Sequence, residues 1–277
     1  MQRVGLIGHP VAHSVSPLFQ QAAFDATGLK ARYEAWDTLE AGLEQRLASL
    51  RGDDILGANV TVPFKEMVQP YLDEIDPVAA RIGSVNTIVN HGGRLHGYNT
   101  DADGFALGCE DADIDLGLRP AVVVGAGGAA RAVVYALTET DPRSVLVLNR
   151  TVERAREIAV EFGAGCDSLA DAPTSVFQTA RLVVNATSVG MRHGPPGMPF
   201  DPALLTSGCS VVDLVANPLQ TELMIEAERA GCWVQGGLHM LVYQGAAAFE
   251  LWTELEAPVR LMLETALRAT LDQADES

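Results

Sequence analysis

The chain has 277 residues, enough for one large or two ordinary domains, and its hydrophobic content of 48 % is sufficient for a packed core. The formal net charge is −17 and the basic residues form no cluster, so we expect no nucleic-acid partner. No run of about eighteen apolar residues predicts a membrane span, and the first residues enter a strand directly, so we expect no signal peptide. The 4 cysteines lack metal-ligand spacing, which favours free thiols, no metal and a cytoplasmic location.

Residues 1–101 alternate apolar runs of strand length with segments of helical period. Strands are predicted at 4–8, 33–36, 55–60, 85–89 and 95–98. Helices are predicted at 16–26, 39–50 and 63–71, and Gly92-Gly93 predicts a hairpin turn. This alternation predicts an α/β fold with a mostly parallel sheet and helices on both faces.

The pattern restarts after an acidic stretch at 109–120, which predicts a domain boundary. Strands are predicted at 121–124, 145–148, 182–184, 211–214 and 233–235, and helices at 127–138 and 152–162. Residues 240–271 have a helical pattern and are expected to pack back on the first domain, and the acidic tail 272–277 is expected to be disordered. We therefore predict a substrate domain at 1–101, a Rossmann domain at 102–237 and returning helices at 238–277.

A glycine-rich turn at residues 125–130 joins a predicted strand to a predicted helix. In its sequence, GAGGAA, Gly125 permits the tight turn, Gly127 lets the backbone approach a pyrophosphate, and Ala130 permits close helix–strand packing. An ordinary strand–helix turn is the alternative. The flanking elements favour a dinucleotide site.

The end of the next strand indicates which dinucleotide binds. An NAD site usually places a carboxylate there for the ribose 2′-hydroxyl, but this chain has Asn149, Arg150 and Thr151, with Arg154 one turn later. Arginine can pair with a 2′-phosphate that a carboxylate would repel. The residues therefore favour NADP(H), although Thr151 could also cap the helix and the arginines could be solvated.

Residues 59–66, NVTVPFKE, contain Lys65, one of only two lysines; the other is Lys30. A buried lysine can lose a proton and an arginine cannot, so Lys65 is a candidate catalytic group. The alternative is a surface lysine in the first turn of a helix that begins after Pro63.

Further polar residues fall at predicted strand ends, where open α/β sheets bind ligands. They are Ser14, Ser16, Asn59, Thr61, Asn86, Thr87, Asn99, Thr100 and Asp101. Ser16 with Pro17 is also a typical helix N-cap and first helical position. Together these groups predict a site for a small polyhydroxylated acid.

The chain resembles the shikimate dehydrogenase family over nearly its whole length. The motifs are GHPVAHSVSP (8–17), NVTVPFK (59–65), GSVNT (83–87), GYNTD (97–101), GAGGAA (125–130), NRT (149–151), NATSVGM (185–191) and MLVYQ (240–244). The resemblance implies reversible reduction of 3-dehydroshikimate to shikimate with NADPH, in the pathway to the aromatic amino acids.

The resemblance also implies a role for each matching residue. Ser14 and Ser16 would hold the substrate carboxylate, and Lys65 would face the reacting oxygen. The substrate hydroxyls would be bound by Thr61, Asn86, Asp101 and Gln244. The cofactor would be bound by Gly125, Ala126, Gly127, Gly128, Ala129, Ala130, Asn149, Arg150, Thr151, Arg154, Thr187, Leu214 and Gly237, the last two near the nicotinamide.

Lys65 as an ammonium can stabilise charge on the reacting oxygen and deliver a proton, with Asp101 as its partner. Attraction to Asp101 favours the charged lysine and burial opposes it, so the acid–base role and the electrostatic role both stay open. A structural role is expected for His13.

Two positions depart from the family pattern. Residues 213–218 read DLVANP where the family commonly has Asp-x-x-Tyr-x-Pro, so Ala216 lacks a hydroxyl directed at the substrate. His239 stands where glycine is common and is expected to be a surface residue.

The alternatives are a quinate/shikimate or aminoshikimate-type dehydrogenase, or a catalytically silent NADP-binding regulator. Asn149 argues against NAD and quinate, and intact Lys65 and Asp101 argue against the regulator. The sequence leaves a monomer and a homodimer open.

Overall fold

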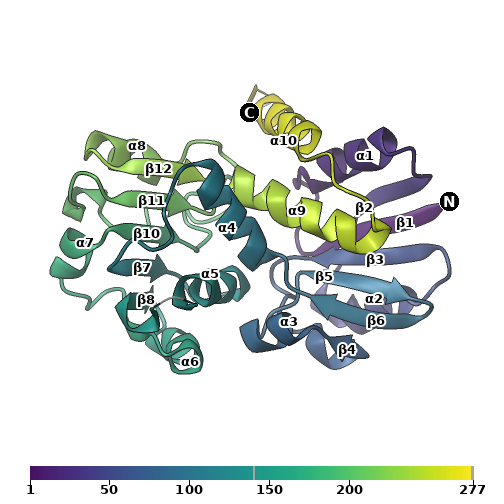
Figure 1. Cartoon of the computed structure of the whole chain (residues 1–277), viewed down its shortest axis with the longest axis horizontal. Coiled ribbons are helices and arrows are strands. Elements are labelled where there is room, and N and C mark those ends of the chain that lie inside the picture. The colour runs from purple at the N-terminus through teal and green to yellow at the C-terminus, as the bar shows by residue number, and fades with distance from the viewer. Residues whose placement is uncertain (140, 276–277) are drawn as a thin grey trace. The chain divides into compact units, whose positions relative to one another are not determined.

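The computed structural model describes residues 1–139 and 141–275 and divides the chain into two compact units (Figure 1). Unit 1 contains Met1–Gly104 and the segment that begins at Val242, and Unit 2 is Phe105–Leu241. Among the described residues, no helix combines the length and apolar character that crossing a membrane requires. Each unit is an α/β structure built on its own sheet, as the alternation of strands and helices predicts.

Unit 1 is built on a six-stranded mixed sheet in the order β2-β1-β3-β5-β6-β4. The strands are β1 (Gln2–Gly8), β2 (Ala31–Asp37), β3 (Ile55–Val60), β4 (Glu74–Ile75), β5 (Thr87–His91) and β6 (Arg94–Tyr98). β1 pairs in parallel with β2 and β3, and β4 pairs in parallel with β6, whereas β5 is antiparallel to β3 and β6. The carboxyl ends of β1, β3 and β6 and the amino end of β5 therefore meet at one edge.

The helices of Unit 1 cover both faces of this sheet. They are α1 (Ser16–Ala26), α2 (Leu43–Ser49), α3 (Pro77–Ile82) and α10 (Val259–Asp275), with the short 3₁₀ helices η1 (Glu40–Gly42) and η2 (Gln69–Tyr71). Two longer helices, α4 (Asp101–Asp111) and α9 (Leu238–Thr253), have residues in both units.

The C-terminal helices pack on Unit 1, as predicted. Within that unit α10 packs against α1. On α9, the Phe249 ring lies 5.3 Å from the Phe24 ring, and Trp252 Nε1 donates to the backbone oxygen of Ile88 at 2.9 Å. The last part of the chain thus completes the core of the first unit.

Unit 2 is built on a six-stranded parallel sheet in the order β12-β11-β10-β7-β8-β9. Its strands are β7 (Ala121–Val124), β8 (Val145–Asn149), β9 (Gly165–Ser168), β10 (Leu182–Asn185), β11 (Ser210–Asp213) and β12 (Trp233–Gly236). The helices are α5 (Gly128–Thr138), α6 (Val152–Phe162), α7 (Ser175–Thr179) and α8 (Glu222–Arg229), with η3 (Pro142–Ser144) and η4 (Pro202–Leu204). This is the doubly wound order of a Rossmann domain, in which successive strands are added first on one side of β7 and then, from β10 onward, on the other side.

Three predicted elements are wrong in part. Residues 63–71 form turns that end in η2 rather than a continuous helix, because the Lys65 carbonyl accepts from Val85 N at 2.8 Å instead of continuing a helical ladder. The predicted helix 240–271 is two helices, because Glu254 has a φ of 57° and Pro258 has no N–H to donate. The tail expected to be disordered is helical as far as Asp275, while residues 276–277 lie outside the described residues.

Candidate functional site

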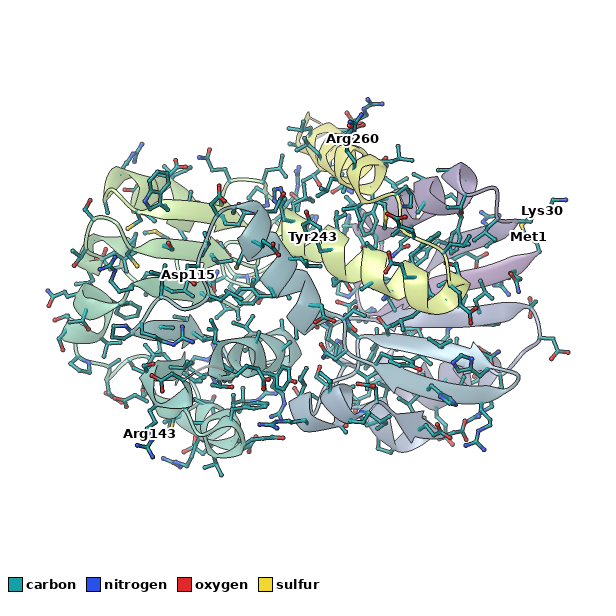
Figure 2. The ribbon with its side chains drawn as sticks, viewed as in Figure 1. Met1, Lys30, Asp115, Arg143, Tyr243 and Arg260 are labelled. Carbon is teal, nitrogen blue, oxygen red and sulfur yellow. The ribbon has the colours of Figure 1, made fainter. Side chains whose placement is uncertain are left out.

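Lys65 and Asp101 form an ion pair in Unit 1. Lys65 Nζ donates to Asp101 Oδ2 at 2.6 Å, and the two side chains are 15 % and 3 % exposed. The other lysine, Lys30, points into solvent (Figure 2). Phe64, buried in the core beside Val68, anchors the turn that carries Lys65. The structure therefore supports a partly desolvated ammonium rather than an ordinary surface lysine.

Asn86 holds the other oxygen of Asp101. Asn86 Nδ2 donates to Asp101 Oδ1 at 2.8 Å, to Thr100 Oγ1 at 2.9 Å and to Gln244 Oε1 at 3.1 Å. The Thr100 hydroxyl also donates to the backbone oxygen of Gln244 at 2.9 Å. The structure thus brings together Lys65, Asn86, Asp101 and Gln244, although Gln244 is far from the others in sequence.

Topology explains this convergence. Asp101 follows β6, and Lys65 follows β3, at the edge where these strands end. Asn86 immediately precedes β5 and reaches the same edge from the amino end of an antiparallel strand, not from a carboxyl end as predicted. Asn99 Oδ1 accepts from the backbone N–H of Asp101 at 3.0 Å, so the amide of Asn99 fixes the start of α4.

Ser14, Ser16 and Thr61 lie at this edge as well, after β1 and β3. Ser16 is buried, and its backbone N–H donates to Ser14 Oγ at 3.2 Å. Ser16 is the first residue of α1 rather than its N-cap, which is Val15, and no side chain caps this helix. In this first turn the Leu18 N–H donates to the Val15 oxygen at 3.0 Å, and Pro17 has no N–H. The hydroxyls of Ser14 and Ser16 are therefore the groups that can face an anion here. Thr61 is half-buried.

The glycine-rich turn in Unit 2 has the backbone that a dinucleotide site requires. Gly125 has a φ of 120°, and a Cβ there would lie 2.7 Å from the Ala186 oxygen. Gly127 is the N-cap of α5, with no side-chain cap and open space around it. Ala130 is fully buried in the core between α5 and the sheet. Ala126, Gly128 and Ala129 complete the turn and the first residues of α5.

The four residues predicted to bind the 2′-phosphate lie at the end of β8 and the start of α6. Asn149 Nδ2 donates to the Thr151 oxygen at 2.9 Å, and Arg150 and Arg154 are exposed. Thr151 occupies the N-cap position, but its hydroxyl makes no capping bond, so the expected capping role is wrong. Within the described residues Arg150 forms no ion pair, which leaves its guanidinium available to an anion.

Thr187 belongs to a buried polar network that includes a carboxylate not predicted from the sequence. The Thr187 hydroxyl donates to Asn185 Oδ1 at 2.7 Å, and Asn185 Nδ2 donates to Asp213 Oδ1 at 2.8 Å. Thr221 Oγ1 donates to Asp213 Oδ2 at 2.6 Å. Burial raises the pKa of Asp213, against the opposing effect of these donors. Its signal in the sequence was its place in an apolar run, where it is the last residue of β11.

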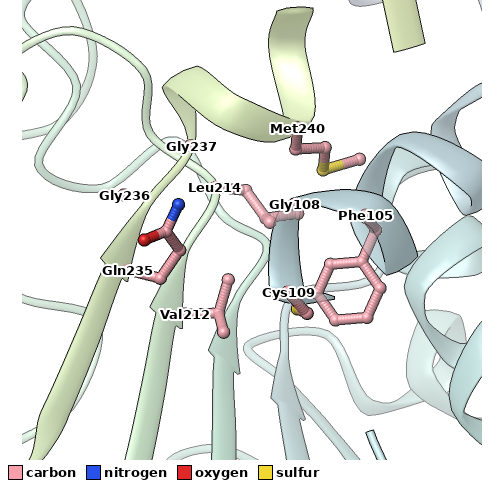
Figure 3. Close-up of a pocket in the computed structure, with 9 residues that line it drawn as sticks. All are labelled: Phe105, Gly108, Cys109, Val212, Leu214, Gln235, Gly236, Gly237 and Met240. Carbon is pink, nitrogen blue, oxygen red and sulfur yellow. The ribbon is translucent and has the colours of Figure 1, made fainter. Parts of the chain in front are cut away.

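A narrow pocket in Unit 2 contains Leu214 and Gly237, the two residues expected near a nicotinamide (Figure 3). Its other lining residues are Phe105, Gly108, Cys109, Val212, Gln235, Gly236 and Met240. A Cβ on Gly237 would lie 2.2 Å from the Leu214 oxygen, so the backbones meet closely there. Burial raises the pKa of the Cys109 thiol to about 12, so the thiol stays protonated and lines the pocket as an unreactive group.

The two departures from the family pattern differ in their surroundings. Ala216 is half-buried. His239 is not a plain surface residue: its Nδ1 lies 2.7 Å from Gln235 Nε2, and its Nε2 lies 3.3 Å from Asp111 Oδ2. Because Gln235 Nε2 can only donate, Nδ1 of His239 is the acceptor and Nε2 carries a proton toward Asp111.

Three family models match successive parts of the chain. A shikimate dehydrogenase substrate binding domain matches residues 6–88, a shikimate/quinate 5-dehydrogenase model matches residues 111–191, and a shikimate 5′-dehydrogenase C-terminal domain matches residues 237–267.

Curated relatives match over nearly their full length. The chain is 50 % identical to a shikimate dehydrogenase (NADP(+)) of Moorella thermoacetica, covering 94 % of this chain and 90 % of that protein. It is 46 % identical to one from Thermus thermophilus, covering 97 % and 99 %. A crystal structure of shikimate 5-dehydrogenase from another strain of Thermus thermophilus, in complex with NADP(H) and shikimate, aligns with a TM-score of 0.89 and 44 % identity, covering 97 % and 100 %.

Proposed function

Because this chain belongs to the shikimate dehydrogenase family, we propose that it catalyses the reversible, NADPH-dependent reduction of 3-dehydroshikimate to shikimate. The reaction is a step of the shikimate pathway to the aromatic amino acids. The single observation that carries the catalytic part of this proposal is the partly buried Lys65–Asp101 pair, with Nζ and Oδ2 2.6 Å apart. It supplies a cation and a proton at the edge of the sheet where the other polar groups gather.

Unit 1 is the proposed substrate domain. The hydroxyls of Ser14 and Ser16 would hold the carboxylate, because hydroxyl donors at a helix start suit an anion. The substrate hydroxyls would be bound by Thr61, Asn86, Asp101 and Gln244. This assignment is supported by the hydrogen bonds that already link Asn86 to Asp101 and Gln244.

Lys65 is the proposed catalytic group at the reacting oxygen. The ammonium stabilises the negative charge that develops on this oxygen and can deliver the proton that completes the alcohol. Asp101 accepts from Lys65 and keeps the ammonium oriented, and Asn86 keeps the carboxylate oriented in turn. Electrostatic stabilisation needs only the positive charge of the ammonium, whereas acid catalysis requires the transfer of one of its protons to the substrate. A pH–rate profile separates the two contributions.

Unit 2 is the proposed NADP(H) domain, and its residues fit that cofactor. Gly127 leaves open space and uncapped N–H groups at the start of α5, where a pyrophosphate would lie. Arg150 and Arg154, with Asn149 and Thr151, would hold the 2′-phosphate, and no carboxylate stands at the end of β8 to repel it. Thr187, Leu214 and Gly237 would line the site near the nicotinamide. When bound, the reduced nicotinamide supplies a hydride.

A cytoplasmic location is part of the proposal, supported by the cysteines of the described residues, which are all free thiols. The proposal is tested by absorbance at the nicotinamide band, with shikimate or quinate as substrate and NADP or NAD as oxidant. We expect fast turnover with shikimate and NADP. Turnover only with quinate or NAD would make the chain a quinate-type enzyme, and tight NADPH binding without any turnover would make it a non-catalytic relative.

A further inference from the structure

We propose that Tyr33, a buried residue of β2, positions the Lys65–Asp101 pair through a directed series of hydrogen bonds. This inference rests on the proposed function, because it assigns Tyr33 a role in the same reaction. It concerns residues of Unit 1 alone. Tyr33 does not contact the pair directly, so it is a positioning residue and not a catalytic one.

The series runs from Tyr33 to Asp101 through three amide or hydroxyl side chains. Tyr33 Oη donates to Asn59 Oδ1 at 2.8 Å, and Asn59 Nδ2 donates to Thr87 Oγ1 at 3.1 Å. Thr87 Oγ1 donates to Asn86 Oδ1 at 3.1 Å, and Asn86 Nδ2 donates to Asp101 Oδ1 at 2.8 Å. Every group in the series donates toward Asp101, so each bond polarises the next in the same sense.

Neighbouring backbone groups fix this direction. The Thr100 N–H, which can only donate, binds Asn86 Oδ1 at 2.8 Å and leaves Asn86 Nδ2 to face Asp101. The Asn86 carbonyl, which can only accept, takes a bond from Asn59 Nδ2 at 3.2 Å. Asn59 must therefore turn its Oδ1 toward Tyr33, and only a donor can satisfy that oxygen.

A tyrosine suits this end of the series. Tyr33 is only 5 % exposed, and its ring centroid lies 6.2 Å from that of Trp252 on α9. Burial raises the pKa of Tyr33, so the phenol stays protonated and remains a donor. Phenylalanine at this position would keep the ring packing and remove the donor alone.

Loss of the Tyr33 hydroxyl should weaken the hydrogen bonding of Asp101. Asn59 Oδ1 would be buried without a partner, and the Asn59 amide, which the Asn86 carbonyl and Thr87 hold on one side, would lose the contact that fixes its position on the other side. The hold of Asn86 on Asp101 would then weaken, so Asp101 would orient the Lys65 ammonium less firmly. Within the described residues, Lys65 is the charged group that contacts Asp101. Asn86, which donates to the carboxylate, and Asn99, which accepts from the Asp101 N–H, are neutral.

The test is Tyr33→Phe, assayed with shikimate and NADP over a range of pH. We expect kcat to fall roughly three- to tenfold, with KM for shikimate changed less than about twofold. A loss that is confined to kcat at each pH indicates a misoriented Lys65 rather than weaker substrate binding. The matched control is Tyr71→Phe, which removes a phenol hydroxyl from a side chain of the same unit that is 39 % exposed. It should leave kcat and KM at wild-type values.

A second variant separates positioning from packing. In the double variant Tyr33→Phe, Asn59→Leu, the orphaned acceptor is removed together with its donor, so the thermal midpoint should rise toward that of the wild type. The value of kcat should stay lowered, because the series to Asp101 is still broken. A kcat that recovers together with the thermal midpoint would assign Tyr33 a packing role and overturn the inference.

Activity of the wild-type protein tests the proposed function before any variant is compared. If it does not oxidise shikimate with NADP, the proposed function and this inference fail together. If it does, and Tyr33→Phe keeps the wild-type kcat, the inference alone fails.

Discussion

Lys65 and Asp101 stand 36 positions apart in the sequence and share a hydrogen bond of 2.6 Å between Nζ and Oδ2. One follows β3 and the other is the first residue of α4, and the sheet brings the two chain segments to one edge. The carboxylate receives a second donor from Asn86, at 2.8 Å. Both partners of the ion pair are thus oriented before any ligand arrives, which is what preorganised catalysis needs.

Removal of the Lys65 side chain should stop the chemical step. We expect Lys65→Ala to lower kcat roughly 10²–10⁴-fold, because both the positive charge and the proton at the reacting oxygen are lost. KM for shikimate should change little. Steady-state kinetics of purified protein measures this, with Lys30→Ala, the exposed lysine, as the matched control. A near-normal kcat with a raised KM would make Lys65 a binding residue.

Restoring a hydroxyl at position 216 should strengthen substrate binding. Ala216→Tyr introduces the phenol that the family commonly places there, and one new hydrogen bond is worth about 0.5–1.5 kcal/mol. KM for shikimate should therefore fall roughly two- to twelvefold relative to Ala216→Phe, which adds the same ring without the donor. Equal KM values for the two variants would show that the hydroxyl has no partner in the bound complex.

Arg150 should discriminate NADP from NAD. Arg150→Ala removes a charge-assisted donor from the proposed 2′-phosphate site, so KM for NADP should rise roughly ten- to a hundredfold. Kinetics with NAD should not change, because NAD lacks the phosphate. Arg143→Ala, another exposed arginine of Unit 2, is the control (Figure 2). An equal loss with both dinucleotides would place Arg150 away from the 2′-phosphate.

Asp213 should make the stability of Unit 2 depend on pH. Burial raises the pKa of Asp213 above the ordinary value of 3.8. The contribution of Asp213 to the free energy of unfolding is therefore fully present at a pH below 3.8. The contribution is lost as pH rises through the raised pKa of the folded state, because the buried carboxylate then ionises.

The variant Asp213→Asn removes this titration and can keep the bonds to Asn185 and Val215. We expect its thermal midpoint, relative to the wild type, to increase as pH is raised from about 4 to about 7. The exposed Asp171→Asn is the control. A difference in midpoint that is constant with pH would contradict the raised pKa.

Much of the fold was predictable because local patterns in this chain agree with its tertiary structure. The six parallel strands of Unit 2 include five that are short, apolar runs recognised in the sequence, and the glycine-rich turn falls between β7 and α5. The missed helix α4 begins at Asp101 and contains Gly104 and Gly108, which lower helix propensity. A Cβ on Gly104 would lie 2.7 Å from Gln244 Cβ, so close packing within Unit 1 explains that glycine.

The errors arose where tertiary contacts override local preference. Residues 63–71 have a helical pattern, but a backbone bond from Val85 to Lys65 and the burial of Phe64 hold them in turns. Thr151 and Ser16 looked like caps, yet the hydroxyl of Thr151 makes no capping bond and Ser16 lies inside its helix. Cap geometry depends on backbone angles that a residue type does not specify.

By itself the sequence determined the fold class, the dinucleotide turn and the set of polar residues that carry the chemistry, because each of these depends on residue type at short spacing. Only the tertiary structure decided which of those residues touch, how far Lys65 is desolvated, and that Asp213 is buried in Unit 2. The Tyr33–Asp101 series depends on strands β2, β3 and β5 lying in a defined register. Register and burial follow from how distant segments pack, and no local pattern contains that information.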